Sequence, residues 1–201
     1  MEILGQITSD TVFASYIKKY ISEYRPQTIV ESGTWKGMGS TMRIIEAITN
    51  NGLDSLFISL EINFEFYKIA LNNLRDYTNK CILLYGRVVE VSDIINFIRQ
   101  NELSHEQTGW AQEDLLNTAR CSNVTTLIPK KIDFLLLDGG EFSTYAEWKL
   151  LGSRSSIIGL DDVRCLKCKK IVEELMNDEN YEQLTTNSEK NGFAFFKRKD
   201  I

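Results

Sequence analysis

Acidic residues follow four of the short apolar runs in this chain, at Glu31, Glu61, Asp138 and the pair Asp161-Asp162. Each run is typical of a buried strand, and the carboxyl ends of parallel strands meet at the edge of an open sheet where ligands bind. Carboxylates at that edge repel a polyphosphate, whereas they accept hydrogen bonds from ribose hydroxyls and attract positive charge. The pattern therefore predicts a site for a cationic, ribose-bearing molecule, with Glu61 holding the ribose.

A glycine-rich turn follows the first of these runs. Thr28-Ile29-Val30 is β-branched and leads through Glu31 into a turn that contains Gly33 and Gly37. Ser40-Thr41 then precedes a run with helical periodicity, so we expect these hydroxyls to cap a helix. A strand, a bare glycine turn and a helix N-terminus together let a ligand lie against the backbone. We predict that a nucleoside-bearing cofactor binds at this turn.

The elements that position these residues alternate between strand and helix along the chain. We predict strands at 28–30, 55–60, 81–85, 132–137 and 156–160, and helices that start at Ser9 or Asp10, after Ser40-Thr41, at Asn63, Ser92, Trp110 and Thr144 (a capping box with Glu147), and after Asp162. The tail, at 181–185 and 193–196, is typical of an antiparallel hairpin. These repeats predict an α/β fold of the Rossmann-like, doubly wound type, with a mostly parallel seven-stranded sheet that ends in the hairpin.

We expect a single domain over residues 1–201. Residues 1–27 form an N-terminal helical segment in this interpretation. Residues 102–131 form an insertion that lengthens the crossover before the fourth strand, because a plain crossover needs far fewer residues. The insertion could serve as a lid or as a docking surface, and we expect its Trp110 to anchor a helix to the core rather than to wall a pocket.

Composition restricts the partners and the compartment. The formal net charge is −5, so we expect no nucleic-acid partner, which would usually require a basic face. No apolar run has the length of a membrane span, and the first residues lack a signal peptide, which predicts a cytoplasmic protein without a membrane partner. The single histidine, His105, excludes multi-histidine metal sites and lies in a polar stretch typical of a solvated loop.

Four motifs, taken in order, carry a family resemblance. They are Glu31-x-Gly33-Thr34-x-x-Gly37 with Ser40-Thr41, Leu60-Glu61, Leu137-Asp138-Gly139-Gly140 and Leu160-Asp161-Asp162-Val163. Together they resemble the class I S-adenosylmethionine-dependent methyltransferases, and they are most similar to the small-molecule O-methyltransferase branch that includes catechol O-methyltransferase. The resemblance covers residues 28–197. The glycine turn alone is a weak signal, and the specificity comes from the set.

The resemblance implies a set of cofactor contacts. The turn 33–35 would face the methionine part of S-adenosylmethionine, Glu61 would hold the ribose, and residues 85–87 would border the adenine. The residues expected to bind the cofactor are Glu31, Gly33, Thr34, Trp35, Gly37, Ser40, Glu61, Tyr85, Gly86, Arg87 and Asp138.

The resemblance also implies a candidate metal site. Metal-dependent members of the family hold Mg²⁺ or Ca²⁺ with the acid after the fourth strand and an acid–amide pair after the fifth. These positions match Asp138 and Asp161-Asp162 here, so all three are oxygen ligands, as hard cations require, but an aspartate replaces the amide. Asp161 or Asp162 could instead cap the helix that follows. The sequence leaves the choice between a metal and a cap open.

The family's catalytic lysine falls on Glu141 in this chain, so Asp138 or Glu141 would have to deprotonate the acceptor if no metal assists. The expected function is methyl transfer to an oxygen or nitrogen of a small-molecule acceptor. A cofactor-binding accessory protein without catalysis is one alternative. A nicotinamide-dependent oxidoreductase is another, which the spacing Gly33-x-x-x-Gly37 disfavours because it departs from G-x-G-x-x-G. No motif indicates the acceptor or the oligomeric state.

Overall fold

The computed structural model describes residues 7–8 and 10–199 of the chain. The helices are α1 Val12–Tyr24, α2 Ser40–Asn50, α3 Phe64–Asn73, α4 Val91–Arg99, α5 His105–Arg120, α6 Thr144–Leu151 and α7 Leu166–Asn177. The strands are β1 Thr28–Ser32, β2 Leu56–Glu61, β3 Ile82–Tyr85, β4 Ile132–Leu137, β5 Ser155–Asp161, β6 Tyr181–Asn187 and β7 Phe193–Arg198. Among the described residues, none of the helices combines the length and the hydrophobicity of a transmembrane span.

The strands form one seven-stranded sheet with the order β3-β2-β1-β4-β5-β7-β6. β1 to β5 are parallel, whereas β7 pairs antiparallel with both β5 and β6. The predicted Rossmann-like, doubly wound fold with a C-terminal hairpin is therefore confirmed. β1 and β4 are neighbours although they belong to different halves of the chain, so the strand order reverses between them, where doubly wound sheets open a ligand crevice.

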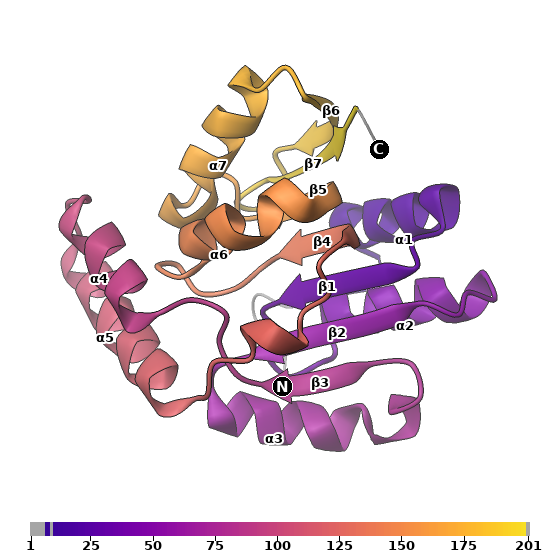
Figure 1. Ribbon diagram of the computed structural model, residues 1–201, viewed down its shortest axis with the longest axis horizontal. Coiled ribbons are helices and arrows are strands. Elements are labelled where there is room, and N and C mark those ends of the chain that lie inside the picture. Colours follow the sequence, from indigo (N-terminus) through magenta and orange to yellow (C-terminus); the bar gives the residue numbers. More distant parts are fainter. Residues whose placement is uncertain (1–6, 9, 200–201) are drawn as a thin grey trace.

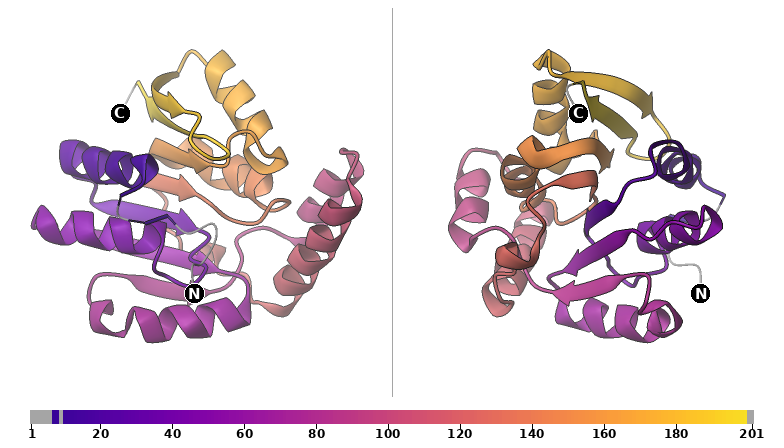
Figure 2. Two further views of the ribbon diagram at one scale, coloured as in Figure 1. Left: turned by 180° about the vertical axis from the view of Figure 1, so that it is seen from behind. Right: turned by 45° about the vertical axis from the view of Figure 1, so that its right-hand side comes forward.

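Helices cover both faces of this sheet, as Figure 1 and the turned views of Figure 2 show. Alternate residues of β4 divide between two cores: Phe134 and Leu136 pack with α1 and α2, whereas Leu135 and Leu137 pack with α4, α6 and α7. All four side chains are fully buried. Burial of such a side chain contributes roughly 1.5–3 kcal/mol, so this strand, buried on both faces, ties the two layers together.

The helix starts differ from the predicted caps in three places. α1 is capped by Thr11, whose Oγ1 accepts from the amide of Ala14 at 3.2 Å, so the cap predicted at Asp10 is wrong by one residue, and Ser9 lies outside the described residues. Ser40 is the first residue of α2 and no side chain caps that helix. The predicted capping box at Thr144 is also absent, because the Thr144 hydroxyl donates to the carbonyl of Gly140 at 2.8 Å.

The cap predicted at Asn63 is confirmed. Its Oδ1 accepts from the amides of Glu65 and Phe66 at 3.0 and 3.2 Å and starts α3.

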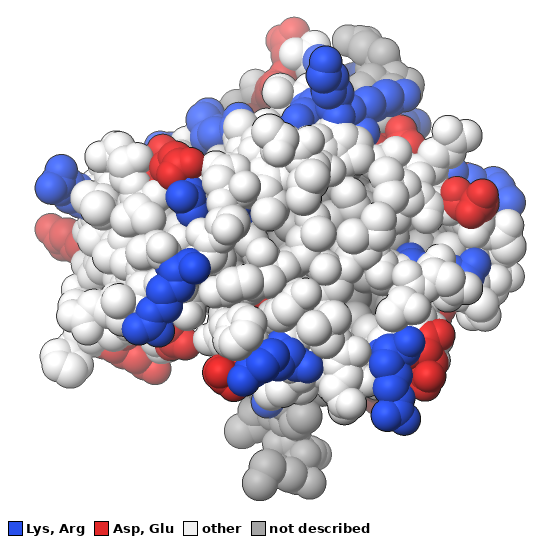
Figure 3. All heavy atoms as spheres, turned by 60° about the horizontal axis from the view of Figure 1, so that its bottom comes forward, with Lys and Arg blue, Asp and Glu red and all other residues white. Residues whose placement is uncertain are grey.

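α3 covers the β3 edge of the sheet but buries little of itself, since Phe64 is 49% exposed. Figure 3 shows the molecule from the side of α3, with most Lys, Arg, Asp and Glu side chains around the rim of a largely uncharged face.

Residues 102–131, which precede β4, consist mainly of one long helix, α5. It begins at His105, five residues before the predicted start, because Ser104 and Gln107 form a capping box there. The expectation that His105 lies in a loop is therefore wrong, although the residue is exposed. α5 packs against α4, and the two helices together project away from the sheet, as the left view of Figure 2 shows.

Candidate active site

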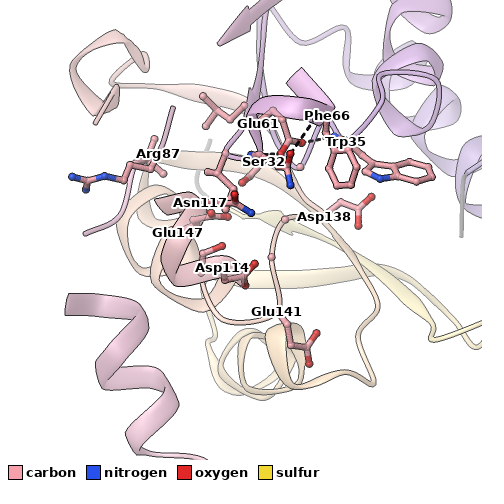
Figure 4. A pocket seen from close by; sticks show the side chains of 18 of the residues that line it. Ser32, Trp35, Glu61, Phe66, Arg87, Asp114, Asn117, Asp138, Glu141 and Glu147 are labelled. Carbon is pink, nitrogen blue, oxygen red and sulfur yellow. Dashed lines mark hydrogen bonds between the residues drawn. The ribbon is translucent and has the colours of Figure 1, made fainter. Parts of the chain in front are cut away.

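A pocket of about 470 Å³ lies at the carboxyl ends of β1, β2 and β4, where the strand order reverses. Side chains from these strand ends line one side of it, and residues of α5 and α6 line the other (Figure 4). Its acidic lining residues are Glu61, Glu113, Asp114, Asp138, Glu141 and Glu147, and the basic residue in the described lining is Arg87. The pocket therefore favours a cationic ligand and disfavours an anionic one.

The glycine turn brings the backbones of the β1 and β4 loops into contact. Gly33 has φ +100°, and a Cβ at this position would lie 2.2 Å from the carbonyl oxygen of Asp138. Its amide and that of Thr34 both donate to the carbonyl of Leu60 at 3.0 Å, which ties the turn to β2. Gly33 is thus required both by its backbone conformation and by this close approach.

Glu61 faces the pocket at the end of β2 with both carboxylate oxygens held. Oε2 accepts from the amide of Trp35 at 2.6 Å, and Oε1 accepts from the amide of Asn63 at 2.7 Å (Figure 4). Only 6% of the residue is exposed. Burial raises the pKa of Glu61 to about 7, and the amide hydrogen bonds only partly offset it. The carboxylate is therefore fixed in place and short of compensating charge.

Several predicted cofactor residues do not line the pocket. Glu31 is fully buried, and its Oε2 accepts from the hydroxyls of Thr41 and Ser59 at 2.6 Å each, so it ties β1, β2 and α2 together. Burial raises the pKa of Glu31. Thr34 joins the same group through a hydroxyl–hydroxyl contact with Ser59. For these side chains the geometry supports a structural role rather than a direct contact with a cofactor.

Three other predicted residues also lie outside the lining of this pocket. Ser40 is buried at the start of α2. Gly37 has φ +80° and packs closely against Leu74, and the ring of Tyr85 lies against Phe64 with centroids 5.2 Å apart. Gly33, Trp35, Glu61, Gly86, Arg87 and Asp138, in contrast, all line the pocket.

The acids after β4 and β5 converge as predicted. Oxygens of Asp138, Asp161 and Asp162 lie within 4.8 Å of one another. Burial, reinforced by the neighbouring carboxylates, raises the pKa of Asp161 to about 8. Burial also raises the pKa of Asp138 to about 6, with Lys167 acting in the opposite direction. Neither Asp161 nor Asp162 caps α7, whose N-cap is Cys165, so that alternative is wrong.

Lys167 is a member of this cluster that sequence reasoning missed. It lies in the first turn of α7, is 5% exposed, and directs Nζ to Asp162 Oδ2 at 2.9 Å and to Asp138 Oδ1 at 3.3 Å. Burial alone would lower the pKa of Lys167, but the two carboxylates outweigh it and raise the pKa. No local spacing signals this contact, because the lysine is 29 residues from Asp138.

Glu141, a predicted catalytic residue, holds the start of α7. Its Oε1 accepts from the amide of Leu166 at 2.9 Å, an interaction that the positive end of a helix favours. Figure 4 shows Glu141 at one end of the lining, apart from Glu61. This geometry gives Glu141 a structural partner and leaves Asp138 as the better placed candidate base.

The side of the pocket formed by α5 and α6 was not foreseen. Burial raises the pKa of Asp114 to about 6, and its Oδ2 accepts from the amide of Phe142 at 3.2 Å. Glu147 is 4% exposed, and its Oε2 has no hydrogen-bond partner among the described residues. Trp110 lines the pocket and is 46% exposed, so the expectation that it anchors α5 to the core is wrong.

The same cluster of acids offers candidate ligands for Mg²⁺ or Ca²⁺. Its three carboxylates, Asp138, Asp161 and Asp162, suit a hard cation in number and kind. However, the ammonium of Lys167 already makes ion pairs with two of them, Asp138 and Asp162, and would compete with a cation for the same oxygens. The residues present therefore do not fit a divalent cation, and the predicted metal assignment gains no support.

Neither protein-family models nor curated protein sequences match this chain. Solved structures are similar to it, among them a putative O-methyltransferase from Klebsiella pneumoniae, with a TM-score of 0.64 and 13% identity over 98% of this chain and 83% of that one. The SAH-bound methyltransferase PaMTH1 from Podospora anserina gives 0.61 and 15%, over 93% and 78%. An O-methyltransferase from Bacillus cereus in complex with SAH gives 0.61 and 14%, over 92% and 80%.

The chain has the fold of these methyltransferases. At these identities the similarity concerns the fold, and it agrees with the family resemblance carried by the four sequence motifs. The comparison covers more than three quarters of each solved chain named above.

Proposed function

We propose that this protein is an S-adenosylmethionine-dependent methyltransferase that moves a methyl group to an oxygen or nitrogen of a small-molecule acceptor. The proposal rests mainly on the position of Glu61, whose carboxylate is held by two backbone amides beside the glycine turn at Gly33. It lies at the switch point of a doubly wound sheet, where such folds bind nucleosides. SAH or SAM in several solved structures with this fold supports the choice of cofactor.

The pocket residues suggest how the cofactor would lie. The remaining lone pairs of Glu61 would accept from the ribose hydroxyls, and the turn at Gly33 and Trp35 would face the methionine part. Gly86 and Arg87 also line the pocket and would border the adenine, with Arg87 at the opposite end of the lining from Trp35 in Figure 4. The excess of carboxylates would favour the positively charged sulfonium over the neutral product, since opposite charges attract.

The reaction itself needs little covalent chemistry from the protein. With S-adenosylmethionine bound, the acceptor atom would attack its methyl carbon while the carbon–sulfur bond breaks, which would release S-adenosylhomocysteine. Most of the rate enhancement in such a transfer comes from holding both reactants in near-attack geometry. Asp138 lines the pocket beside Gly33, so its carboxylate can take the acceptor proton. No step in this scheme uses a divalent cation.

The proposal is tested by calorimetric titration with S-adenosylmethionine, S-adenosylhomocysteine and NAD. We expect the two adenosyl compounds to bind and NAD not to bind. Glu61→Ala should weaken their binding by about 1.5–3 kcal/mol, the range for hydrogen bonds to a charged group. The matched control is Glu65→Ala, which removes an exposed acid from the nearby helix α3 and should leave the affinity unchanged.

Other results of these measurements would exclude Glu61 from the cofactor site or change the proposed function. Equal affinity in the Glu61→Ala variant and the wild type would remove Glu61 from the cofactor site. Preferential binding of NAD would replace the methyltransferase proposal with an oxidoreductase. Binding of S-adenosylmethionine without transfer of a labelled methyl group to any member of a broad set of phenols, sugars and amines would favour a non-catalytic accessory role.

A further inference from the structure

A buried ammonium lies inside the cluster of acids at the ends of β4 and β5. Lys167 Nζ is 2.9 Å from Asp162 Oδ2, 3.3 Å from Asp138 Oδ1 and 3.4 Å from the carbonyl oxygen of Gly139. Its side chain is only 7% exposed, whereas those of Asp138 and Asp162 are 20% and 30% exposed. The positive charge is therefore enclosed, and the carboxylates separate it from solvent.

The lysine is held in this place by its helix. The start of α7 is fixed by the bond from the amide of Leu166 to Glu141, and the next residues on the inner face, Cys168 and Ile171, are fully buried. Asp162 is fixed in turn, because its Oδ1 accepts from Nδ2 of Asn191 at 3.0 Å. The ammonium can therefore leave the cluster only if its ion pairs with Asp138 and Asp162 both break.

This arrangement is incompatible with a divalent cation at the same point. Mg²⁺ and Ca²⁺ require carboxylate oxygens to converge at about 2.0–2.6 Å. Two of the three candidate ligands already direct an oxygen to the ammonium. A second positive ion among the same oxygens would be repelled by Lys167 in a site that water screens poorly.

We propose that the ammonium of Lys167 takes the place of the divalent cation, so that Asp138, Asp161 and Asp162 do not bind Mg²⁺ or Ca²⁺ and methyl transfer proceeds without either ion. Lys167 is a positioning residue here: it orients the carboxylate of Asp138 toward the pocket and supplies a fixed positive charge. The part of this inference that concerns turnover rests on the proposed methyltransferase function. The part that concerns cation binding does not.

The first test uses the wild-type protein. Mn²⁺ serves as a paramagnetic probe that stands in for Mg²⁺, and Ca²⁺ binding is measured by calorimetry. Both measurements are made on the protein without cofactor. We expect no stoichiometric binding of either ion at submillimolar concentration. Binding of one ion per chain that is lost in the Asp161→Asn/Asp162→Asn variant would overturn the proposal. Cofactor affinity is measured separately, so failure here is distinguishable from failure of the proposed function.

The second test removes the ammonium. Lys167→Met keeps an unbranched apolar stem without charge, and we expect it to create a cation site, with at least tenfold tighter Mn²⁺ binding than the wild type and a melting temperature that Mn²⁺ raises. Lys169→Met, at an exposed position on the same helix, is the control and should bind no more Mn²⁺ than the wild type. A folded Lys167→Met variant that binds no Mn²⁺ would overturn the proposal.

Two further measurements test the proposal without the Lys167→Met variant, in case that variant does not fold. Lys167→Arg retains a positive charge and should remain insensitive to Mn²⁺. Wild-type methyl transfer, once an acceptor is known, should change less than twofold when EDTA is added or Mg²⁺ is supplied. A tenfold loss of turnover in EDTA that Mg²⁺ restores would contradict the inference directly.

Discussion

The ends of β2 and β4 both carry a carboxylate that faces the pocket, but different groups hold the two. Glu61 is held by the amides of Trp35 and Asn63, which donate hydrogen bonds and carry no full charge. Asp138 is paired with the buried ammonium of Lys167. The protein therefore leaves the negative charge of Glu61 for a ligand and compensates that of Asp138 itself.

This difference assigns separate tasks to the two ends of the pocket. An uncompensated carboxylate attracts hydroxyl donors and positive charge, which suits the ribose and the sulfonium of the proposed cofactor. A carboxylate that is paired with an ammonium, such as Asp138, keeps a fixed orientation and can exchange a proton without binding a metal ion. The glycine turn lies between the two ends, because Gly33 contacts the carbonyl of Asp138 and its amide bonds to β2.

The largest expected effect comes from removing the compensating charge. Lys167→Met should lower the free energy of unfolding by about 3–5 kcal/mol, because the buried partners of a broken ion pair are left uncompensated. Lys169→Met should change it by no more than about 0.5 kcal/mol, as is usual for exposed positions. Urea denaturation of both variants measures the difference. Equal stabilities would mean that Lys167 is not buried in an ion pair in solution.

A smaller effect is expected from the turn that joins the two ends. Gly33→Ala places a Cβ 2.2 Å from the carbonyl oxygen of Asp138 at a φ of +100°. The strained backbone and the steric clash should together cost about 2–4 kcal/mol of stability. Gly52→Ala is the matched control, because Gly52 also has positive φ but no atoms near its added Cβ. Gly33→Ala should destabilise the protein more than this control.

The pH dependence of stability distinguishes the uncompensated carboxylate. The pKa of Glu61 is raised from 4.5 to about 7, mainly by burial, so the folded state holds this proton more tightly than the unfolded state. Its contribution to stability is therefore fully present below about pH 4.5 and is lost as the pH rises through about 7. The total is at most about 3 kcal/mol.

Glu61→Gln isolates this contribution from the other titrating groups. Between pH 4.5 and 8 the variant should lose less stability than the wild type, and urea denaturation across that range measures the difference. Parallel curves for the two proteins would mean that the pKa of Glu61 is close to its ordinary value. Bound S-adenosylmethionine should reduce the same difference, because a sulfonium and two ribose hydroxyls favour the ionised carboxylate.

The sequence predicted most of the sheet correctly because strand signals are local. The apolar run Ile132–Leu137 and the hairpin near Phe193 follow from hydrophobicity and turn residues within a few positions. Of the predicted row of acids, Glu61 and Asp161 end β2 and β5 and Asp138 directly follows β4, so these three lie at the same end of the parallel strands. Glu31 instead lies within β1 and bonds to hydroxyls of the core. Helix caps were predicted less well, because neighbouring hydroxyls and glycines compete for the same backbone groups.

What the sequence alone determined was therefore the fold class, the bare turn at Gly33 and the row of acids at the strand ends. Only the tertiary structure decided what each acid does: Glu31 bonds to hydroxyls of the core, Glu141 holds a helix and Glu61 faces the pocket. It also decided that Lys167 neutralises Asp138. The physical reason is that burial and charge pairing depend on residues far apart in the chain, whereas strand and turn propensities act over a few neighbouring positions.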